Sequence, residues 1–269
     1  MAEPVCTVNR QAWRAGDFFA GVRVIPEETA VAFTYDGSSF AVMMATPQDL
    51  EDFAVGFSLN EGIVGMPSEI ERLAILEEEA GIELRMTLAG ARAEVLKQRR
   101  RFLAGPVGCG LCGIESLQEA TRPLPRVPAG ARVTPEAILR AVEAIGAAQA
   151  LGERTRAVHA AALCAADGGL IALREDVGRH NALDKLAGVL ARSGQLATNG
   201  MIVLTSRLSV ELVQKAAAMA APILVAVSAP TALAVRSAET AGITLAAVAR
   251  RDGFEVFTHG ERIATLADV

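Results

Sequence analysis

Two cysteines in a glycine-rich stretch are the residues of this chain with the clearest capacity for chemistry. Cys109 and Cys112 form a C-x-x-C pair within "GPVGCGLCG", residues 105–113. Such a pair can hold a metal ion, cycle between dithiol and disulfide, or carry a sulfur atom as a persulfide. A structural zinc site normally takes four ligands, and the chain has no second C-x-x-C. A thioredoxin-like dithiol follows a strand, whereas Gly-Pro-Val-Gly precedes this pair.

Sulfur relay makes different demands on the same stretch. It requires an exposed, mobile thiolate that can meet both a donor and an acceptor, and a glycine-rich loop supplies that mobility. The basic residues Lys97, Arg99, Arg100 and Arg101 would lower a thiol pKa if the loop folded over them, but they also suit the solvated end of a strand. Zinc binding, redox cycling, sulfur relay and two chemically idle cysteines therefore stay open at this point.

The first half of the chain predicts a small α+β unit that leads into the cysteines. Two β-rich runs flank Asp36-Gly37 and predict a hairpin over residues 29–45. Thr46 followed by Pro47 predicts the N-cap and first turn of a helix. Residues 72–95 predict further strands around Gly81. We expect an N-terminal domain, then a Cys-containing loop and linker, then a C-terminal domain, with the bounds 1–104, 105–133 and 134–269.

The second half predicts an α/β fold. A helix over 134–151, a hairpin over 158–176 and a helix over 178–194 precede three strands that alternate with two helices. Alternation of this kind predicts parallel strands with helices on both faces, a three-layer α/β/α arrangement. Right-handed crossovers then bring the strand-to-helix turns to one edge of the sheet, where ligands usually bind.

Several polar residues fall at these turns. Ser206 and Arg207 end one strand, Thr231 follows the next, and Arg250 follows the third. Hydroxyls, backbone N–H groups and arginines at helix N-termini favour an anion, although ordinary N-capping explains Ser and Thr equally. In the helix over 178–194, His180 and Asp184, like Asn181 and Lys185, are spaced i,i+4 as on a helix surface. His180 follows Gly178 and Arg179 and is also a candidate for the ligand edge.

Composition narrows the class of protein. The chain has 269 residues, 51% of them hydrophobic, so a sizeable core can form. The net charge of −5 does not favour a general polyanion binder. No run of about 18 apolar residues predicts a membrane span, and the N-terminus lacks the apolar stretch of a secretory signal. We therefore expect a cytoplasmic protein whose cysteines are reduced unless they do chemistry.

Five motifs occur in one order along the chain: "GCGLCG", "REDVGRHNALDKLAG", "TSRLSVELVQKAA", "SAPTALAV" and "AGITLAAVARRDGFEVFTHGERI". Together with "TPQDLEDFAVGFSLNEGI", they resemble the formate dehydrogenase accessory sulfurtransferases, the FdhD family. The resemblance runs with gaps from about residue 30 to the C-terminus.

The resemblance implies a function. Family members accept sulfur from a cysteine desulfurase as a persulfide, and the carrier maps to Cys109, with Cys112 as a second thiol. They pass the sulfur to the molybdenum cofactor, as bis-molybdopterin guanine dinucleotide, and so activate formate dehydrogenase. The resemblance also implies a homodimer. The alternative function is a non-catalytic carrier or chaperone of the cofactor. The family's cofactor-binding stretch maps to Val248, Ala249, Arg250, Arg251, Asp252 and Gly253.

This sequence departs from the family pattern at three positions: Val248 stands where an aromatic residue is common, Ala247 where glycine is, and Ala232 where serine is. The second half is also similar to cytidine-deaminase-like domains, which gives the predicted fold class: a cytidine-deaminase-like C-terminal domain with a smaller N-terminal α+β domain. The zinc deaminases need H-x-E and P-C-x-x-C at two helix starts. The corresponding starts here read "DVGRHNA" and "TSRLSVE", which excludes a deaminase.

Overall fold

The structure is a computed structural model of the chain, and the residues that it describes are 3–94, 96 and 124–264. The predicted sulfur carrier Cys109, its neighbour Cys112 and the basic run from Lys97 to Arg101 lie outside the described residues. Within the described part, the strands form a two-stranded, a four-stranded and a six-stranded sheet.

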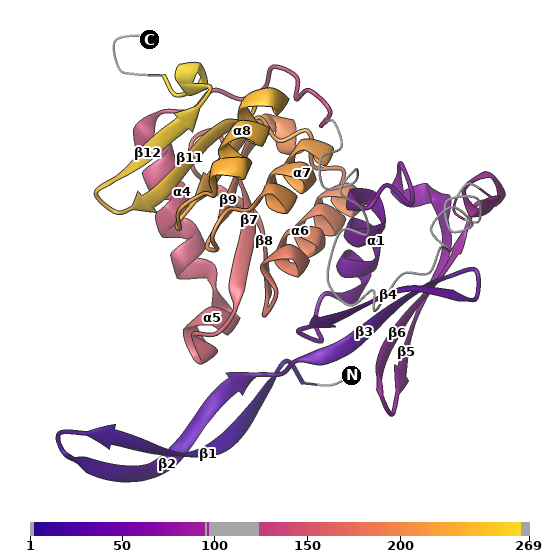
Figure 1. Ribbon diagram of the computed structural model, residues 1–269, viewed down its shortest axis with the longest axis vertical. Coiled ribbons are helices and arrows are strands. Elements are labelled where there is room, and N and C mark those ends of the chain that lie inside the picture. The colour runs from indigo at the N-terminus through magenta and orange to yellow at the C-terminus, as the bar shows by residue number, and fades with distance from the viewer. Residues whose placement is uncertain (1–2, 95, 97–123, 265–269) are drawn as a thin grey trace.

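The two-stranded sheet is an N-terminal hairpin that the sequence analysis did not predict. Strands β1 (Val5–Arg14) and β2 (Asp17–Pro26) pair antiparallel around Ala15-Gly16, and the hairpin projects from the body of the molecule (Figure 1). Trp13, Phe18 and Phe19 are 61%, 63% and 54% exposed. The hairpin therefore presents large apolar side chains to solvent. A lone two-stranded ladder of this kind gains little stability from burial.

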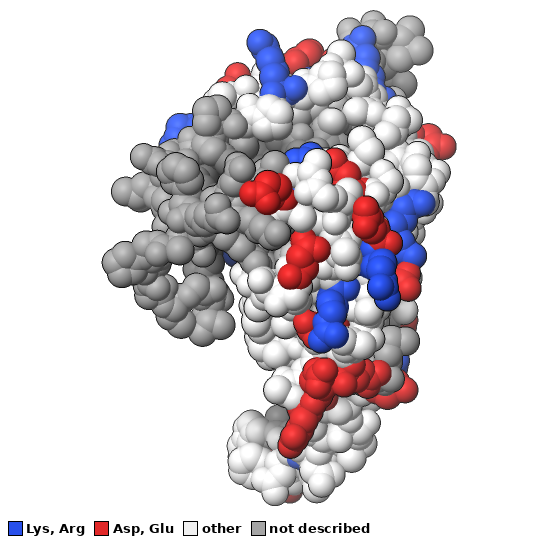
Figure 2. Space-filling view, turned by 90° about the vertical axis from the view of Figure 1, so that its right-hand side faces the viewer, with Lys and Arg blue, Asp and Glu red and all other residues white. Residues whose placement is uncertain are grey.

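The four-stranded sheet contains the predicted hairpin over residues 29–45 and the predicted strands around Gly81. Its strands are β3 (Thr29–Tyr35), β4 (Ser38–Ala45), β5 (Ile70–Glu78) and β6 (Gly81–Leu88), in the order β4-β3-β6-β5. Strands β3 and β6 run parallel, and the other two pairs run antiparallel. Helix α1 (Leu50–Asn60) covers one face, where Phe33 stacks on Phe57 with ring centroids 4.0 Å apart. Figure 2, in which the right-hand side of the Figure 1 view faces the reader, shows both acidic and basic side chains on the exposed surface.

Two predictions in this half are wrong. The N-cap of α1 is Asp49, in the left-handed conformation with φ 54°, and Thr46 does not cap the helix. The Thr46 hydroxyl is fully buried and instead accepts the N–H of Val177, 3.1 Å away. The predicted strands over 72–95 end at Leu88, and residues 90–94 are helical, because alanine-rich sequence favours a helix once the sheet pairing ends.

The six-stranded sheet forms the second half. Its strands are β7 (His159–Ala165), β8 (Leu170–Asp176), β9 (Gly200–Leu204), β10 (Ile223–Ala226), β11 (Thr244–Arg250) and β12 (Gly253–Thr258), in the order β12-β11-β10-β9-β7-β8. Strands β9, β10 and β11 are parallel, as predicted. The β7–β8 hairpin and β12 add antiparallel pairs, so the sheet is mixed.

Helices cover both faces of this sheet, as the alternation predicted (Figure 1). One face packs against α4 (Pro135–Ala148), whose N-cap Thr134 accepts the N–H of Ala137. The short α5 (Ala150–Thr155) follows it. The other face packs against α6 (Arg179–Ser193), α7 (Val210–Ala218) and α8 (Ala232–Ala241). The structure is therefore mixed α/β.

Helix α1 also contacts α6, and this contact joins the four-stranded sheet to the six-stranded one. Gly56 and Gly188 lie where the helices meet: a Cβ on Gly56 would lie 1.7 Å from the Asp184 carbonyl oxygen, and one on Gly188 would lie 1.8 Å from that of Asp52. Only glycine permits so close an approach of two backbones. The domain bounds at residues 104 and 133 stay a prediction.

Across the described parts of the chain, every helix is too short or too polar to span a bilayer.

Candidate functional site

The carboxyl ends of four strands meet at one edge of the six-stranded sheet. Strands β9, β10 and β11 are parallel, and β8 has the same direction because it is antiparallel to β7, which is antiparallel to β9. Helices α6, α7 and α8 each begin after one of these strands. Three helix N-termini, with their free N–H groups and positive dipole ends, therefore lie along the same edge.

Backbone hydrogen bonds join the turns at this edge into one surface. The Leu208 N–H donates to the Ala229 carbonyl at 3.2 Å, and the Thr231 N–H donates to the Leu208 carbonyl at 2.9 Å. The Val248 N–H donates to the Ser228 carbonyl at 3.3 Å. The segments that carry Ser206, Arg207, Thr231 and Val248–Gly253 are thus adjacent, as the strand order predicted.

The first of these turns is longer than predicted. Strand β9 ends at Leu204 and α7 begins at Val210, so Ser206 and Arg207 lie in the turn, and the N-cap is Ser209. Residues 205–209 do not join helix α7, because Leu208 forms a β-bridge with Pro230 in the next turn. The Ser206 hydroxyl donates to the Arg207 carbonyl at 3.2 Å, and the Arg207 side chain is exposed.

Thr231 is an N-cap, the simpler of its two predicted roles. Its hydroxyl oxygen accepts the Ala234 N–H at 3.2 Å. The remaining free N–H groups of the first turn of α8 face the same edge.

The stretch Val248–Gly253 combines a bulge with a tight turn. Val248 has φ 54°, a conformation that a β-branched residue rarely adopts, and the β11–β12 register shifts between Ala247 and Arg250. Such strain is found chiefly where a site requires it. The Arg250 guanidinium donates to the Val227 and Ala249 carbonyls, which places its charge beside the neighbouring turn. Arg251 and Asp252 are exposed in the turn that Gly253 closes.

His180 lies in the first turn of α6, at this edge. Burial, reinforced by the positive charges of Arg179 and Lys215, lowers its pKa to about 4, so the ring is neutral at pH 7. Its Nε2 lies 4.0 Å from a Glu211 carboxylate oxygen, beyond hydrogen-bond distance. Within the described residues, the buried atoms His180 Nε2 and Arg179 Nε have no hydrogen-bond partner. Both can bond a ligand that enters the edge.

The two predicted i,i+4 pairs do not form a solvated helix surface. Asn181, Asp184 and Lys185 are at most 2% exposed, and each bonds to another element. Lys185 pairs with Asp176 at 2.6 Å, and Asp184 pairs with Lys215 of α7 at 2.8 Å. Of the two alternatives that the spacing left open, the solvated helix surface does not hold for these three residues, because α1 and α7 supply polar partners that cover this face of α6.

The residues that hold the beginning of α6 were not predicted from the sequence to do so. Asp176 ends β8 and its carboxylate accepts the Gly178 N–H at 2.8 Å, while Thr46 accepts the Val177 N–H. The local signal was the Asp-x-Gly spacing before the helix, which is typical of an Asx turn. No sequence pattern near Thr46 indicates that its hydroxyl bonds to the Val177 N–H.

The arrangement is suited to an anionic ligand. Arg179, Arg207, Arg250 and Arg251 lie on the segments that make up the edge, together with three helix N-termini. Phosphate groups are bound at such places by backbone N–H groups and arginines. In the described ranges, no three His, Cys, Asp or Glu side chains are grouped as metal ligands.

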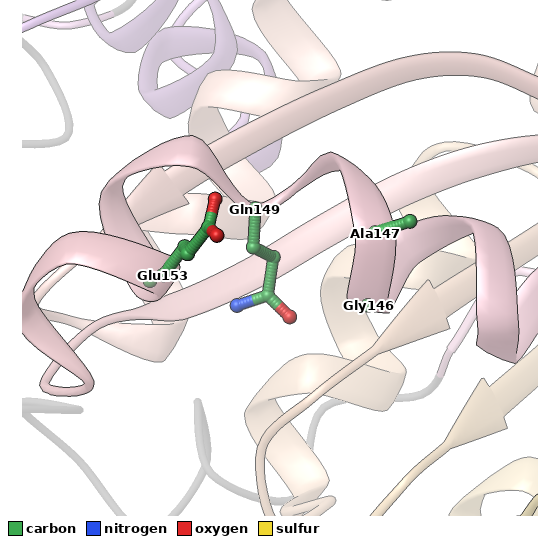
Figure 3. Close-up of a pocket in the computed structure, with 5 residues that line it drawn as sticks. Gly146, Ala147, Gln149 and Glu153 are labelled. Carbon is green, nitrogen blue, oxygen red and sulfur yellow. The ribbon is translucent and has the colours of Figure 1, made fainter.

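A separate pocket lies at the junction of α4 and α5, and it contains none of the predicted site residues. It is lined by Gly146, Ala147, Gln149, Gly152 and Glu153 (Figure 3). The N–H groups of Leu151 and Gly152 donate to the Glu175 carboxylate at 2.8 Å and 2.7 Å, so the polar groups nearby serve the turn between the helices.

Cys164 is ill suited to sulfur chemistry. It is fully buried in β7, and burial raises the pKa of its thiol to about 11. Cys6, in the N-terminal hairpin, is partly exposed.

Most of the chain is similar to known proteins. Residues 26–264 match the model of the FdhD/NarQ family. The "Sulfur carrier protein FdhD" of Agrobacterium fabrum is 52% identical over 257 residues, 95% of each chain. The protein of that name from Cupriavidus necator is 49% identical, over 93% of this chain and 87% of its own.

The fold matches a solved structure as well. The crystal structure of a protein assigned as a formate dehydrogenase accessory protein, from Desulfotalea psychrophila, superposes with a TM-score of 0.73 at 25% identity. The match covers 97% of this chain and 100% of the other. The chain belongs to the FdhD/NarQ family.

Proposed function

We propose that this protein is a sulfurtransferase that takes sulfur from a cysteine desulfurase as a persulfide and passes it to the molybdenum cofactor of a formate dehydrogenase. The observation that carries the proposal is the likeness, over 95% of the chain, to proteins named sulfur carriers. The C-x-x-C pair supplies thiols in a glycine-rich stretch, the composition that a relay between two partners requires.

The sulfur step uses Cys109. Its thiolate attacks the outer sulfur of the desulfurase persulfide, the desulfurase cysteine leaves as a thiolate, and Cys109 becomes the persulfide. The acceptor then attacks that outer sulfur, the S–S bond breaks, and Cys109 leaves as a thiolate. Cys112 is the second thiol beside this carrier.

The acceptor we propose is bis-molybdopterin guanine dinucleotide, held by its phosphates at the edge formed by Ser206, Arg207, Thr231 and Val248–Gly253. His180 lies there as a neutral hydrogen-bonding group. Helix N-termini and arginines support the phosphate assignment. No aromatic side chain stands at Val248, so we assign no stacking contact to guanine.

Three further features of the proposal come from the family resemblance. The donor is a cysteine desulfurase, the client is a formate dehydrogenase, and the active form is a homodimer. The cytoplasmic location is instead proposed from the composition of the chain. The likeness of the second half to cytidine-deaminase-like domains also stays a prediction.

Intact mass spectrometry tests the sulfur step. The reduced protein is incubated with a cysteine desulfurase and cysteine, and its mass is taken without reductant. We expect one added sulfur atom that reductant removes, in the wild type but not in Cys109→Ser. Cys164→Ser is the matched control, because that thiol is buried, and it should still gain the sulfur.

The other outcomes decide against parts of the proposal. Sulfur on Cys109→Ser but not on Cys112→Ser would move the carrier to Cys112. No sulfur on any form would overturn the relay and favour the second candidate, a non-catalytic carrier of the cofactor. That candidate also predicts that Cys109→Ser still restores the activity of a formate dehydrogenase.

GDP, which has the guanine, ribose and diphosphate of the cofactor's nucleotide end, tests the ligand edge. We expect calorimetry to show binding by the wild type and at least tenfold weaker binding by Arg207→Ala, since one charge-assisted bond contributes about 1.5–3 kcal/mol. Arg140→Ala is the control, because Arg140 lies on α4 and bonds the Asp167 carbonyl. Equal affinity in all three proteins would remove Arg207 from the site.

A further inference from the structure

The turn between β4 and α1 reaches from the four-stranded sheet to the beginning of α6. Thr46, in this turn, bonds there through three of its atoms. Its N–H donates to Asp176 at 3.1 Å, its carbonyl accepts the Lys185 ammonium at 2.8 Å, and its hydroxyl accepts the Val177 N–H at 3.1 Å. Met44, two residues earlier, adds a carbonyl that accepts the Asn181 amide at 2.8 Å.

Asp176 is the centre of these contacts. One carboxylate oxygen accepts the Gly178 N–H and the Asn181 amide at 2.8 Å and 2.9 Å. The other accepts the Thr46 N–H and the Lys185 ammonium, the latter at 2.6 Å. The N–H groups of Val177 and Gly178, the last two residues before Arg179 and His180, are therefore both held by this cluster.

The cluster is completely buried, and that carries a cost. Thr46, Asp176 and Lys185 are each 0% exposed. A buried ion pair seldom stabilises a protein more than apolar side chains of the same size would, because both charges lose their hydration. Its advantage is geometric, since every bond in it has a fixed direction. What these bonds fix is the turn from Val177 to His180.

We propose that Thr46, Asp176 and Lys185 are positioning residues for the ligand edge, and that the N-terminal half takes part in the site by holding the Arg179–His180 turn in place. The proposal rests on the cofactor edge proposed above. It assigns a role to Thr46, which lies in the other half of the chain and touches no predicted ligand residue directly.

The proposal makes His180 a reporter. The ring is flanked by Arg179 on its own helix and by Glu211 and Lys215 of α7, and Glu61 lies close on the α1 side. A turn that is held in place keeps the ring buried among these groups. If the turn loosens, the ring gains solvent and its pKa returns towards that of an ordinary histidine.

Thr46→Val is the sharpest variant. Valine keeps the shape and both backbone bonds of Thr46, and leaves the Asp176–Lys185 pair intact, but removes the acceptor for the Val177 N–H. Thr258→Val is the matched control. Thr258 is 5% exposed and its hydroxyl also accepts a backbone N–H, that of Leu245 at 3.1 Å, at the opposite edge of the same sheet.

Two measurements are made on both variants and the wild type, after thermal melting confirms that each is folded. Titration by NMR follows the rings, and the chain has only three histidines. Calorimetry follows GDP. We expect Thr46→Val to raise the pKa of His180 above its wild-type value of about 4 and to weaken GDP binding roughly tenfold, a loss of about 1.4 kcal/mol. Thr258→Val should change neither.

The outcomes separate this proposal from the one on which it rests. An unchanged His180 titration and unchanged GDP affinity in Thr46→Val would overturn the positioning role while leaving the cofactor edge in place. Absence of GDP binding in the wild type would overturn the edge. The positioning role would fall with the edge, and the His180 titration would then show only whether Thr46 holds the Arg179–His180 turn. Equal shifts in Thr46→Val and Thr258→Val would decide against that as well.

Discussion

Two parts of the polar surface of α6 differ in whether their buried polar groups have partners. Where α6 meets α1, the buried charges are paired: Asp176 with Lys185 at 2.6 Å, and Asp52 with Arg174 at 2.7 Å and Arg192 at 2.6 Å. Where α6 begins beside α7, His180 Nε2 and Arg179 Nε are buried and have no partner within the described residues.

The contrast separates two uses of a buried polar group. A group whose bonds are complete holds one arrangement of the chain, and removing a partner costs stability. A group with an open bond costs stability in the free protein and can recover it when a ligand supplies the missing partner. We therefore expect variants that leave a charge unpaired at the α1–α6 contact to act on folding. Variants at the edge, or of the Thr46 hydroxyl that holds it, should act on titration and ligand affinity.

The largest effect is expected from Lys185→Met. The change leaves the Asp176 carboxylate buried without its counter-ion, and breaking such a pair costs about 3–5 kcal/mol. Urea unfolding at pH 7 measures the loss. The double variant Asp176→Asn/Lys185→Met has no uncompensated charge and should recover part of it. A Lys185→Met protein as stable as the wild type would show that the pair contributes nothing to the contact.

Gly188→Ala tests the backbone contact directly. The new methyl group would lie 1.8 Å from the Asp52 carbonyl oxygen, so α1 and α6 must separate, at a cost of about 3 kcal/mol. Gly146→Ala is the matched control in α4, where a Cβ meets nothing within 4 Å and alanine should stabilise the helix by about 0.5–1 kcal/mol. Thermal unfolding of the two variants should shift in opposite directions, and a shift of the same sign would contradict the contact.

These contacts also mark how far local sequence patterns predict the molecule. The Thr-Pro signature was right at Thr134, whose hydroxyl caps the helix that follows it. The same signature was wrong at Thr46, whose hydroxyl bonds to a residue 131 positions away. A local pattern states what a side chain can do, and a distant partner decides which of its options is used.

The place of the proposed ligand edge was predictable for a different reason. Parallel strands that alternate with helices must place their turns together, whatever the side chains are. The positions of Ser206, Thr231 and Arg250 followed from that topology. The burial of Asp184 and Lys185 did not follow, because their i,i+4 spacing from His180 and Asn181 also suits a solvated surface until α1 and α7 are placed over that face.

The open edge should show itself in the pH dependence of stability. The pKa of His180 is about 4 when folded, below its usual 6.5, so between these values the unfolded chain binds a proton that the folded one does not. Stability should therefore fall as the pH falls from 6.5 to 4, by roughly 2–3 kcal/mol from this residue. Urea unfolding at each pH measures the slope.

His180→Asn should flatten most of that slope. A residual part belongs to His159, whose pKa is also lowered by burial and by Arg179. If His180→Asn kept the full slope, the ring would not be held neutral at the edge.

The smallest effect is a gain. Val248 has φ 54°, and the family resemblance implies an aromatic residue at this position. An aromatic side chain lacks the second branch at Cβ that makes this conformation costly for valine, and stacking on a base contributes about 1–3 kcal/mol. Val248→Phe should therefore tighten GDP binding about tenfold by calorimetry. Val256→Phe, at an exposed position of β12, is the control and should not change it. Equal affinity of wild type and Val248→Phe would mean that the base lies away from the bulge, and that the strain at Val248 serves the turn that follows it rather than the nucleotide.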